Sequence, residues 1–72
     1  MTHQRIELDL RDRPAPEPLH NILQYMAVLQ PGDVLCARLR SEPCALFPKI
    51  DPSLFRVILH IEPEILLQIE RI

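Results

Sequence analysis

The two thiols, Cys36 and Cys44, are the side chains of this chain that most readily act as nucleophiles. They have no Cys-x-x-Cys spacing and no histidine at a zinc-finger interval, so the sequence predicts two free thiols and no metal site. Cys36 falls within an apolar, strand-like segment and is interpreted as structural. Cys44 follows Glu42-Pro43 ahead of a second predicted helix, whose dipole would favour the thiolate while the nearby carboxylate would oppose it. Both a reactive and an inert Cys44 therefore fit the sequence.

The three histidines lie far apart in the sequence, on different predicted elements. None stands at metal-ligand spacing from another ligand, so neither a metal nor another cofactor is expected. His20 lies three residues after Glu17 on a predicted helix, which brings the two side chains to the same face. Such a pair can carry out acid–base chemistry, but it can equally solvate the start of a helix.

A proline-rich, charged segment precedes that helix and is the strongest candidate for a binding surface. Two arginines in it, with the amides of the first helical turn, could receive an anion or a carboxylate of a partner. Acidic residues are interspersed among them, so internal ion pairs are an equally good interpretation. Three prolines restrict the backbone, so a partner would lose less entropy in ordering it. The candidate partner- or ligand-binding residues are Arg11, Arg13, Ala15, Pro16, Glu17, Pro18 and His20.

The elements that position this segment follow from the periodicity of the apolar residues. Residues 6–10 alternate between apolar and charged types, which predicts a strand with one buried face. From residue 17 to residue 30 the apolar positions form one stripe of a helix, which Pro31-Gly32 ends. Residues 34–40 form a second predicted strand, with Leu35, Ala37 and Leu39 on its apolar face.

The second half of the chain predicts a short helix and a hairpin. Ser41-Glu42-Pro43 breaks the second strand, and an irregular helix is predicted over residues 45–53, although prolines interrupt it. Residues 55–62 and 65–70 alternate again and predict two strands that turn at Glu62-Pro63-Glu64.

The predicted order is β-α-β-α-β-β in a single domain of residues 1–72. Two strands bridged by a helix favour a right-handed parallel unit, and the terminal hairpin adds antiparallel pairing. Because each strand has one apolar and one mixed face, the helices should cover only one side. The fold class is an α/β (α+β) two-layer sandwich with a mixed four-stranded sheet and two helices on one face. The open face could form a homodimer through an apolar patch of Val34, Cys36, Ile58 and Leu66.

Residues 8–19, Leu-Asp-Leu-Arg-Asp-Arg-Pro-Ala-Pro-Glu-Pro-Leu, resemble the signature of the TusA/SirA-like family of small sulfur-carrier proteins. In that signature a Leu-Asp strand leads into Cys-Pro-x-Pro, and the cysteine carries a persulfide. Leu8 and Asp9 match the end of the strand and residues 16–18 match Pro-x-Pro, whereas Ala15 stands at the cysteine position. Alanine cannot ionise or hold a persulfide sulfur. The chain is therefore similar to a Cys-less, TusA-related branch of bacterial proteins.

The resemblance implies a SirA-like fold with sheet order 1-2-4-3, which also looks like the C-terminal domain of a bacterial translation initiation factor. It covers nearly the whole chain by element order and is most specific over residues 8–19. It further implies that the corner around Ala15 faces partners, because the sulfur-carrier members present this corner. Members of the branch occur alone or beside haemerythrin-like and other redox domains.

Composition narrows the classes of function. Eight basic and ten acidic residues give a formal net charge of −2, and only one tyrosine and two phenylalanines are available for base stacking. Both observations argue against a nucleic-acid binder. The N-terminus carries charges where a signal peptide would be apolar, and no apolar stretch approaches the roughly 20 residues of a membrane helix. We therefore expect a cytoplasmic protein that does not interact with membranes.

These observations favour a non-enzymatic, TusA-like module that binds a protein partner or a small ligand in bacterial redox or sulfur-related metabolism. One alternative is a sulfur carrier in which Cys44 replaces the missing thiol. Another is a nucleic-acid-binding module that uses five arginines, namely Arg5, Arg11, Arg13, Arg38 and Arg40.

Overall fold

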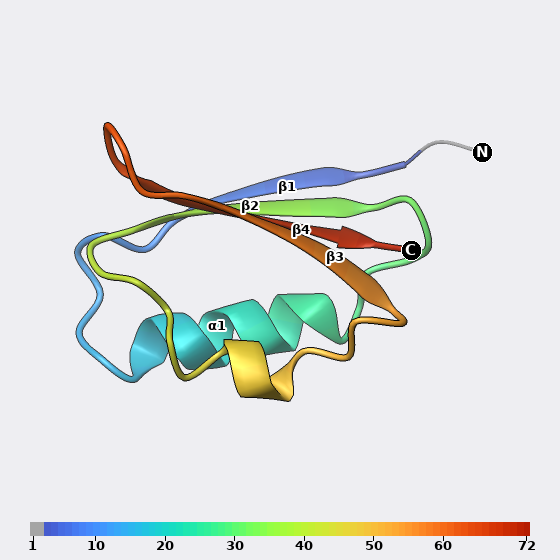
Figure 1. Ribbon diagram of the computed structural model, residues 1–72, viewed down its shortest axis with the longest axis horizontal. Helices are drawn as coiled ribbons and strands as arrows, with labels where there is room; N and C mark the ends of the chain where they lie inside the picture. The colour runs from blue at the N-terminus through green and yellow to red at the C-terminus, as the bar shows by residue number, and fades with distance from the viewer. Residues whose placement is uncertain (1–2) are drawn as a thin grey trace.

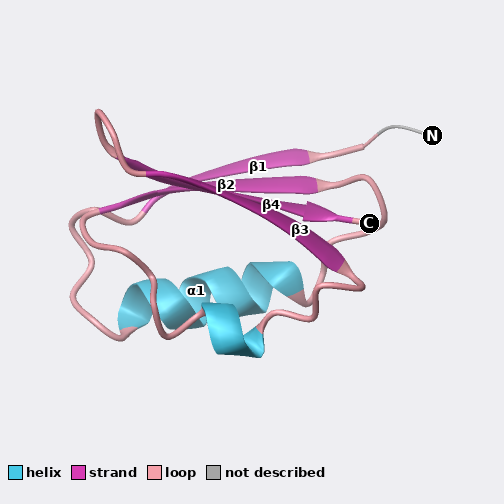
Figure 2. Cartoon of the chain, in the orientation of Figure 1, coloured by secondary structure: helices cyan, strands magenta, loops and turns pink. Residues whose placement is uncertain are grey.

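The computed structural model describes residues 3–72 and shows an α+β domain in which a sheet packs against a helical side (Figure 1). The elements in chain order are β1 (Arg5–Asp9), α1 (Glu17–Met26), β2 (Val34–Leu39), the 3-10 turn η1 (Phe47–Lys49), β3 (Phe55–His60) and β4 (Ile65–Arg71). Figure 2 shows α1 and η1 on the same face of the sheet.

The four strands form one mixed sheet in the order β1-β2-β4-β3. β1 and β2 run parallel, as expected for strands bridged by a helix, and β4 pairs antiparallel with both β2 and β3. This arrangement confirms the predicted mixed sheet, its order and its terminal hairpin. It also places the ends of β1 and β2 side by side, so the segments that follow these two strands leave the sheet at the same corner.

The core lies between the sheet and the helical side. Leu35, Ala37 and Leu39 of β2 are all buried, as the alternation predicted, and Leu67 and Ile69 of β4 lie opposite them. Helix α1 contributes the stripe expected from its periodicity. Ile22 and Met26 are buried and two further leucines pack against the core, while His20 and Gln24 face outward.

Helix α1 ends at Met26, about one turn earlier than the predicted end at residue 30. The chain continues in turns that bring Leu29 into the core. Pro31 disfavours helical geometry at the residue before it. The Asp33 carboxylate also accepts a hydrogen bond from the Gln30 amide at 2.9 Å, and Gly32 adopts a φ of 94°. The predicted helix end was wrong because these local interactions outcompete another helical turn.

The second predicted helix, over residues 45–53, is present only as the three-residue 3-10 helix Phe47–Lys49. Pro48 lacks the amide that a longer helix would need, and Pro52 keeps Asp51 out of helical geometry. The Asp51 carboxylate accepts hydrogen bonds from the Ser53 amide and hydroxyl, which holds a turn instead. The fully buried Leu46 anchors this segment to the core. The domain therefore has one α-helix rather than two.

Candidate functional site

The connection between β1 and α1 is a tight corner built from backbone hydrogen bonds and prolines. The Leu10 amide donates to the Arg38 carbonyl at 2.9 Å, which keeps the chain beside β2 for one residue beyond β1. The Glu17 amide then donates to the Pro14 carbonyl at 3.0 Å. Between these bonds the side chain of Ala15 is exposed.

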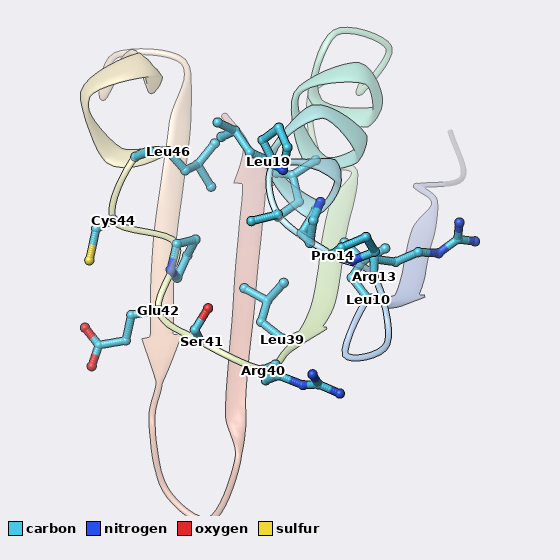
Figure 3. A pocket seen from close by; sticks show the side chains of 16 residues that line it. Leu10, Arg13, Pro14, Leu19, Leu39, Arg40, Ser41, Glu42, Cys44 and Leu46 are labelled. Carbon is cyan, nitrogen blue, oxygen red and sulfur yellow. The ribbon is translucent and has the colours of Figure 1, made fainter.

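A hollow of about 340 Å³ lies between this corner and the segment that follows β2 (Figure 3). Its floor consists of core leucines and isoleucine, and prolines from both segments form its walls. Arg13, Arg40 and Glu42 stand at its edges. The lining residues are Leu10, Arg13, Pro14, Ala15, Pro16, Pro18, Leu19, Ile22, Leu39, Arg40, Ser41, Glu42, Pro43, Cys44, Ala45 and Leu46.

The structure brings four of the seven predicted site residues to the hollow: Arg13, Ala15, Pro16 and Pro18. Three others lie outside it. Glu17 accepts a hydrogen bond from Arg13 at 2.9 Å, so its carboxylate is engaged by that arginine rather than by His20. His20 is exposed on α1 and makes no hydrogen bond through its side chain in the described part of the chain. The Glu17–His20 pair therefore lacks the contact that acid–base chemistry would require.

Arg11 belongs to a separate ion-pair network at the end of the sheet. Its guanidinium donates two hydrogen bonds to Asp9, at 2.8 and 2.6 Å, and lies 3.6 Å from Glu64. Arg38 approaches the same Glu64 at 3.7 Å. The side-chain hydrogen bond from Arg11 lowers the pKa of Asp9 to about 2. Internal ion pairs, one of the two interpretations of these charges, thus occupy Arg11 and Arg13.

The start of α1 offers little for an anion. The amides of Glu17 and His20 donate to the carbonyls of Pro14 and Pro16, and Pro18 has no amide. Among the first-turn amides that the structure describes, only that of Leu19 has no hydrogen-bond acceptor. The first turn therefore offers one free amide to an anion, because a proline removes one donor and the turn uses two.

The sequence missed the second wall of the hollow, which is formed by residues 40–46. This segment was interpreted only as a strand breaker followed by a helix. One feature of the sequence could have indicated this wall: Leu46 is an apolar residue beside Pro43 and Pro48. The structure shows that Leu46 is fully buried. Cys44 lies on this wall and is a free, exposed thiol. Figure 3 shows its sulfur directed away from Leu10 and Leu39, toward the outside of the wall.

The four residues of the predicted apolar patch lie on the open face of the sheet. Charged and polar residues on the neighbouring strands flank each of them. Val34 lies between Arg5 and Glu70, and Leu66 lies between Arg38 and His60. Cys36 is a free thiol that is buried in the centre of this face. Only Ile58 among the four is exposed, with 43% of its surface accessible. The face therefore lacks a contiguous apolar surface.

Within residues 3–72 no three histidine, cysteine or carboxylate side chains come together in a way that could hold a metal ion. The same residues contain no helix with the length and apolar character that a membrane span requires.

The sequence matches no protein-family model, no curated protein and no solved structure.

Proposed function

We propose that this chain is a TusA-like, non-catalytic module that binds a protein partner or a small ligand through the hollow beside Ala15, in bacterial redox or sulfur-related metabolism. The observation that carries the proposal is the hollow itself, which has an apolar floor and two proline-containing walls. Its volume of about 340 Å³ falls within the range typical of ligand sites.

The likeness to TusA-like proteins supports the choice of this corner. The order β1-β2-β4-β3 is the one that the resemblance implies, and Ala15 lies at the hollow, where the sulfur carriers have their nucleophile. The chain departs from a two-helix fold because the 3-10 helix η1 stands where the second helix was expected. A module without the cysteine can retain the surface by which the corner meets a partner while it loses the transfer of sulfur.

The physical properties of the hollow favour recognition of an apolar group. Leu10, Leu39 and Leu46 are buried beneath it, so an apolar side chain or ring that enters would displace water from apolar surface. The charged groups stand apart from this floor, with Arg13 and Arg40 on one side and Glu42 on the other (Figure 3). They are placed to orient a polar part of the same partner.

Filling the hollow tests the proposal. Ala15→Trp should leave the fold intact, since Ala15 is exposed in a loop, and should place an indole ring over the apolar floor. Affinity purification from extracts, followed by a binding titration of the retained protein or compound, should show at least about tenfold weaker binding, or 1.4 kcal/mol.

Val28→Trp is the matched control, because Val28 is exposed and does not line the hollow. This variant should bind as the wild type does. Equal binding by Ala15→Trp and the wild type would place the functional surface elsewhere and refute the proposal.

The sulfur-carrier alternative is kept because Cys44 is a free, exposed thiol on the wall of the same hollow. We expect no persulfide, since Ala15 stands where the resemblance places the persulfide cysteine and alanine cannot hold sulfur. Intact-mass spectrometry after incubation with a cysteine desulfurase and cysteine measures this directly. A gain of one sulfur atom that Cys44→Ser abolishes would establish the sulfur carrier. A gain that only Cys36→Ser abolishes would show that the buried thiol is reactive.

The nucleic-acid alternative receives less support from the structure. Four of the five arginines that it requires are held by carboxylates: Arg5 by Glu7, Arg11 by Asp9, Arg13 by Glu17 and Arg38 by Glu64. Arg40 has no ion-pair partner in the described part of the chain, and one free arginine does not form a basic surface.

A further inference from the structure

The two edges of the sheet differ in how they are protected against pairing with another strand. β1 forms one edge and β3 forms the other. An edge strand presents unpaired amides and carbonyls, and proteins commonly protect it with charged side chains, prolines or bulges. The side chains that accompany the outward-facing backbone groups therefore show which edge can accept a strand.

Hydrogen bonds at the ends of the strands identify the outward-facing groups. In β3, the Leu54 carbonyl accepts from the Ile72 amide at 2.8 Å, so alternate residues beginning with Leu54 face β4. The backbone groups of Val57 and Leu59 consequently point out of the sheet. In β1, the Gln4 carbonyl accepts from Val34 and the Leu10 amide donates to Arg38, so the outward residues are Arg5, Glu7 and Asp9.

The β1 edge is thus protected and the β3 edge is not. Every outward residue of β1 carries a charge, whereas those of β3 are Phe55, Val57 and Leu59. The Phe55 amide already donates to the Asp51 carbonyl, so Val57 and Leu59 carry the free backbone groups. Phe55–His60 contains no proline or lysine, and its one arginine is paired with Glu70 on the neighbouring strand. Beside this edge Ile58 and Ile61 expose 43% and 49% of their surface. Figures 1 and 3 both show η1 on the β3 side of α1, and its Phe47 is exposed as well.

We propose that two copies of this chain associate by antiparallel pairing of their β3 edges, which joins two four-stranded sheets into one continuous sheet. A twofold axis at Leu59 gives a complementary register, in which residues 61 and 62 directly after β3 continue the pairing. It sets Val57 opposite Ile61 of the second copy and Arg56 opposite Glu62 of the second copy. Symmetry repeats both contacts, so the edge is self-complementary in apolar character and in charge.

This register also accounts for the exposed apolar residues near the edge. Ile61 and Ile58 become flanked by a second strand, and the apolar stripe formed by Val57 and Leu59 continues across the dimer. The twofold axis stands perpendicular to the sheet, so the helical sides of both copies lie on the same face. The hollow beside Ala15 lies on the helical side of the sheet, and its wall around Cys44 and Leu46 stands on the β3 side (Figure 3).

Sedimentation equilibrium over a range of protein concentrations should show reversible association to twice the chain mass. Arg56→Glu and Glu62→Arg each place like charges opposite one another at two symmetric positions, and each should raise the dissociation constant at least about fivefold. The double variant Arg56→Glu/Glu62→Arg should restore the affinity of the wild type. Both residues are exposed, so neither variant alters the core. Arg56→Glu also removes the pair with Glu70 within each copy, whereas Glu62→Arg leaves that pair in place and is the cleaner test.

A proline variant tests whether the pairing uses the backbone of β3. Val57→Pro removes an outward amide and leaves the β3–β4 hydrogen bonds in place, so it should give a monomer. Glu7→Pro makes the same change on β1 and should leave the dimer intact. Amide hydrogen exchange should slow at Val57 and Leu59 as the protein concentration rises.

Three results would overturn the proposal. One is a monomer at every concentration. Another is a dimer that resists both Val57→Pro and the charge reversals. The third is a dimer that Leu66→Lys, on the open face, dissociates while the β3 variants do not.

Discussion

Leu67→Ala is expected to lower the free energy of unfolding by about 2–5 kcal/mol, the cost of emptying a well-packed core site. Leu67 is fully buried on β4, with Ala37 of β2 on one side and Leu59 of β3 on the other. A domain of this size is held by only about 3–5 kcal/mol of net core stabilisation. The variant should therefore be partly or largely unfolded in the absence of denaturant.

Urea denaturation followed by circular dichroism measures this loss, and Gln68→Ala is the matched control. Gln68 is the next residue on the same strand and points to the open face, where it makes no hydrogen bond through its side chain in the described residues. The control should change stability by no more than about 0.5 kcal/mol. An equal loss in both variants would mean that the face assignment of β4 is wrong.

The strands could be predicted from the sequence because their side chains alternate over enough residues to define two faces. Leu35, Ala37 and Leu39 are separated by residues of a different character, and all three are buried as expected. The stripe on α1 was equally informative, although Leu23 is only half-buried while Ile22 is fully buried. Periodicity predicts which side of the helix is apolar. The packing of the helix against the twisted sheet decides which of two neighbouring apolar residues reaches the centre of the core.

The segment after β2 could not be predicted in the same way, because it has no periodicity to follow. Three prolines and two side-chain hydrogen bonds of Asp51 decide its path, and each acts over two or three residues only. Consequently the helix predicted over residues 45–53 is reduced to a 3-10 helix of three residues. The hollow was missed for the same reason, since its second wall is this irregular segment.

The ion pairs at the corner between β1 and α1 could be predicted from the sequence only in part. The sequence left open whether Arg11 and Arg13 meet a partner or their own neighbours, and it could not exclude either arrangement. Arg13 and Glu17 are close in sequence, and their pairing could be anticipated. The approach of Arg11 to Glu64 depends on the hairpin turn that lies beside the end of β1. Such a contact becomes visible only when the order of the strands is known.

Replacing Asp33 should have the second largest effect, because its buried carboxylate joins two segments that are distant in sequence. Its Oδ1 accepts from the Gln4 amide and its Oδ2 accepts from the Gln30 amide, both at 2.9 Å. These two bonds tie the start of β1 to the turn that enters β2. Asp33→Asn can accept only one of them, so one partly buried amide loses its acceptor and the variant should melt several degrees below the wild type.

The same carboxylate makes the stability of this joint depend on pH. The backbone hydrogen bonds from Gln4, and then from Gln30, lower the pKa of Asp33 below its ordinary value. A group whose pKa is lower in the folded state stabilises the fold above its unfolded pKa of about 3.9. That contribution is lost as the pH falls through the folded pKa. The difference between the wild type and Asp33→Asn should thus be full at pH 7 and should shrink as the pH falls below about 4.

Thermal unfolding of both proteins from neutral to strongly acidic pH tests this expectation. Asp9, whose pKa is about 2, is present in both proteins, so its titration cancels in the difference. Asp12→Asn is the control, because Asp12 is exposed and its side chain makes no hydrogen bond within residues 3–72. A constant difference between the wild type and Asp33→Asn across this range would show that Asp33 stabilises the joint by packing rather than by its charge. A difference that grows on acidification would mean that the protonated form is the one the fold prefers, which contradicts the two amide donors aimed at its oxygens.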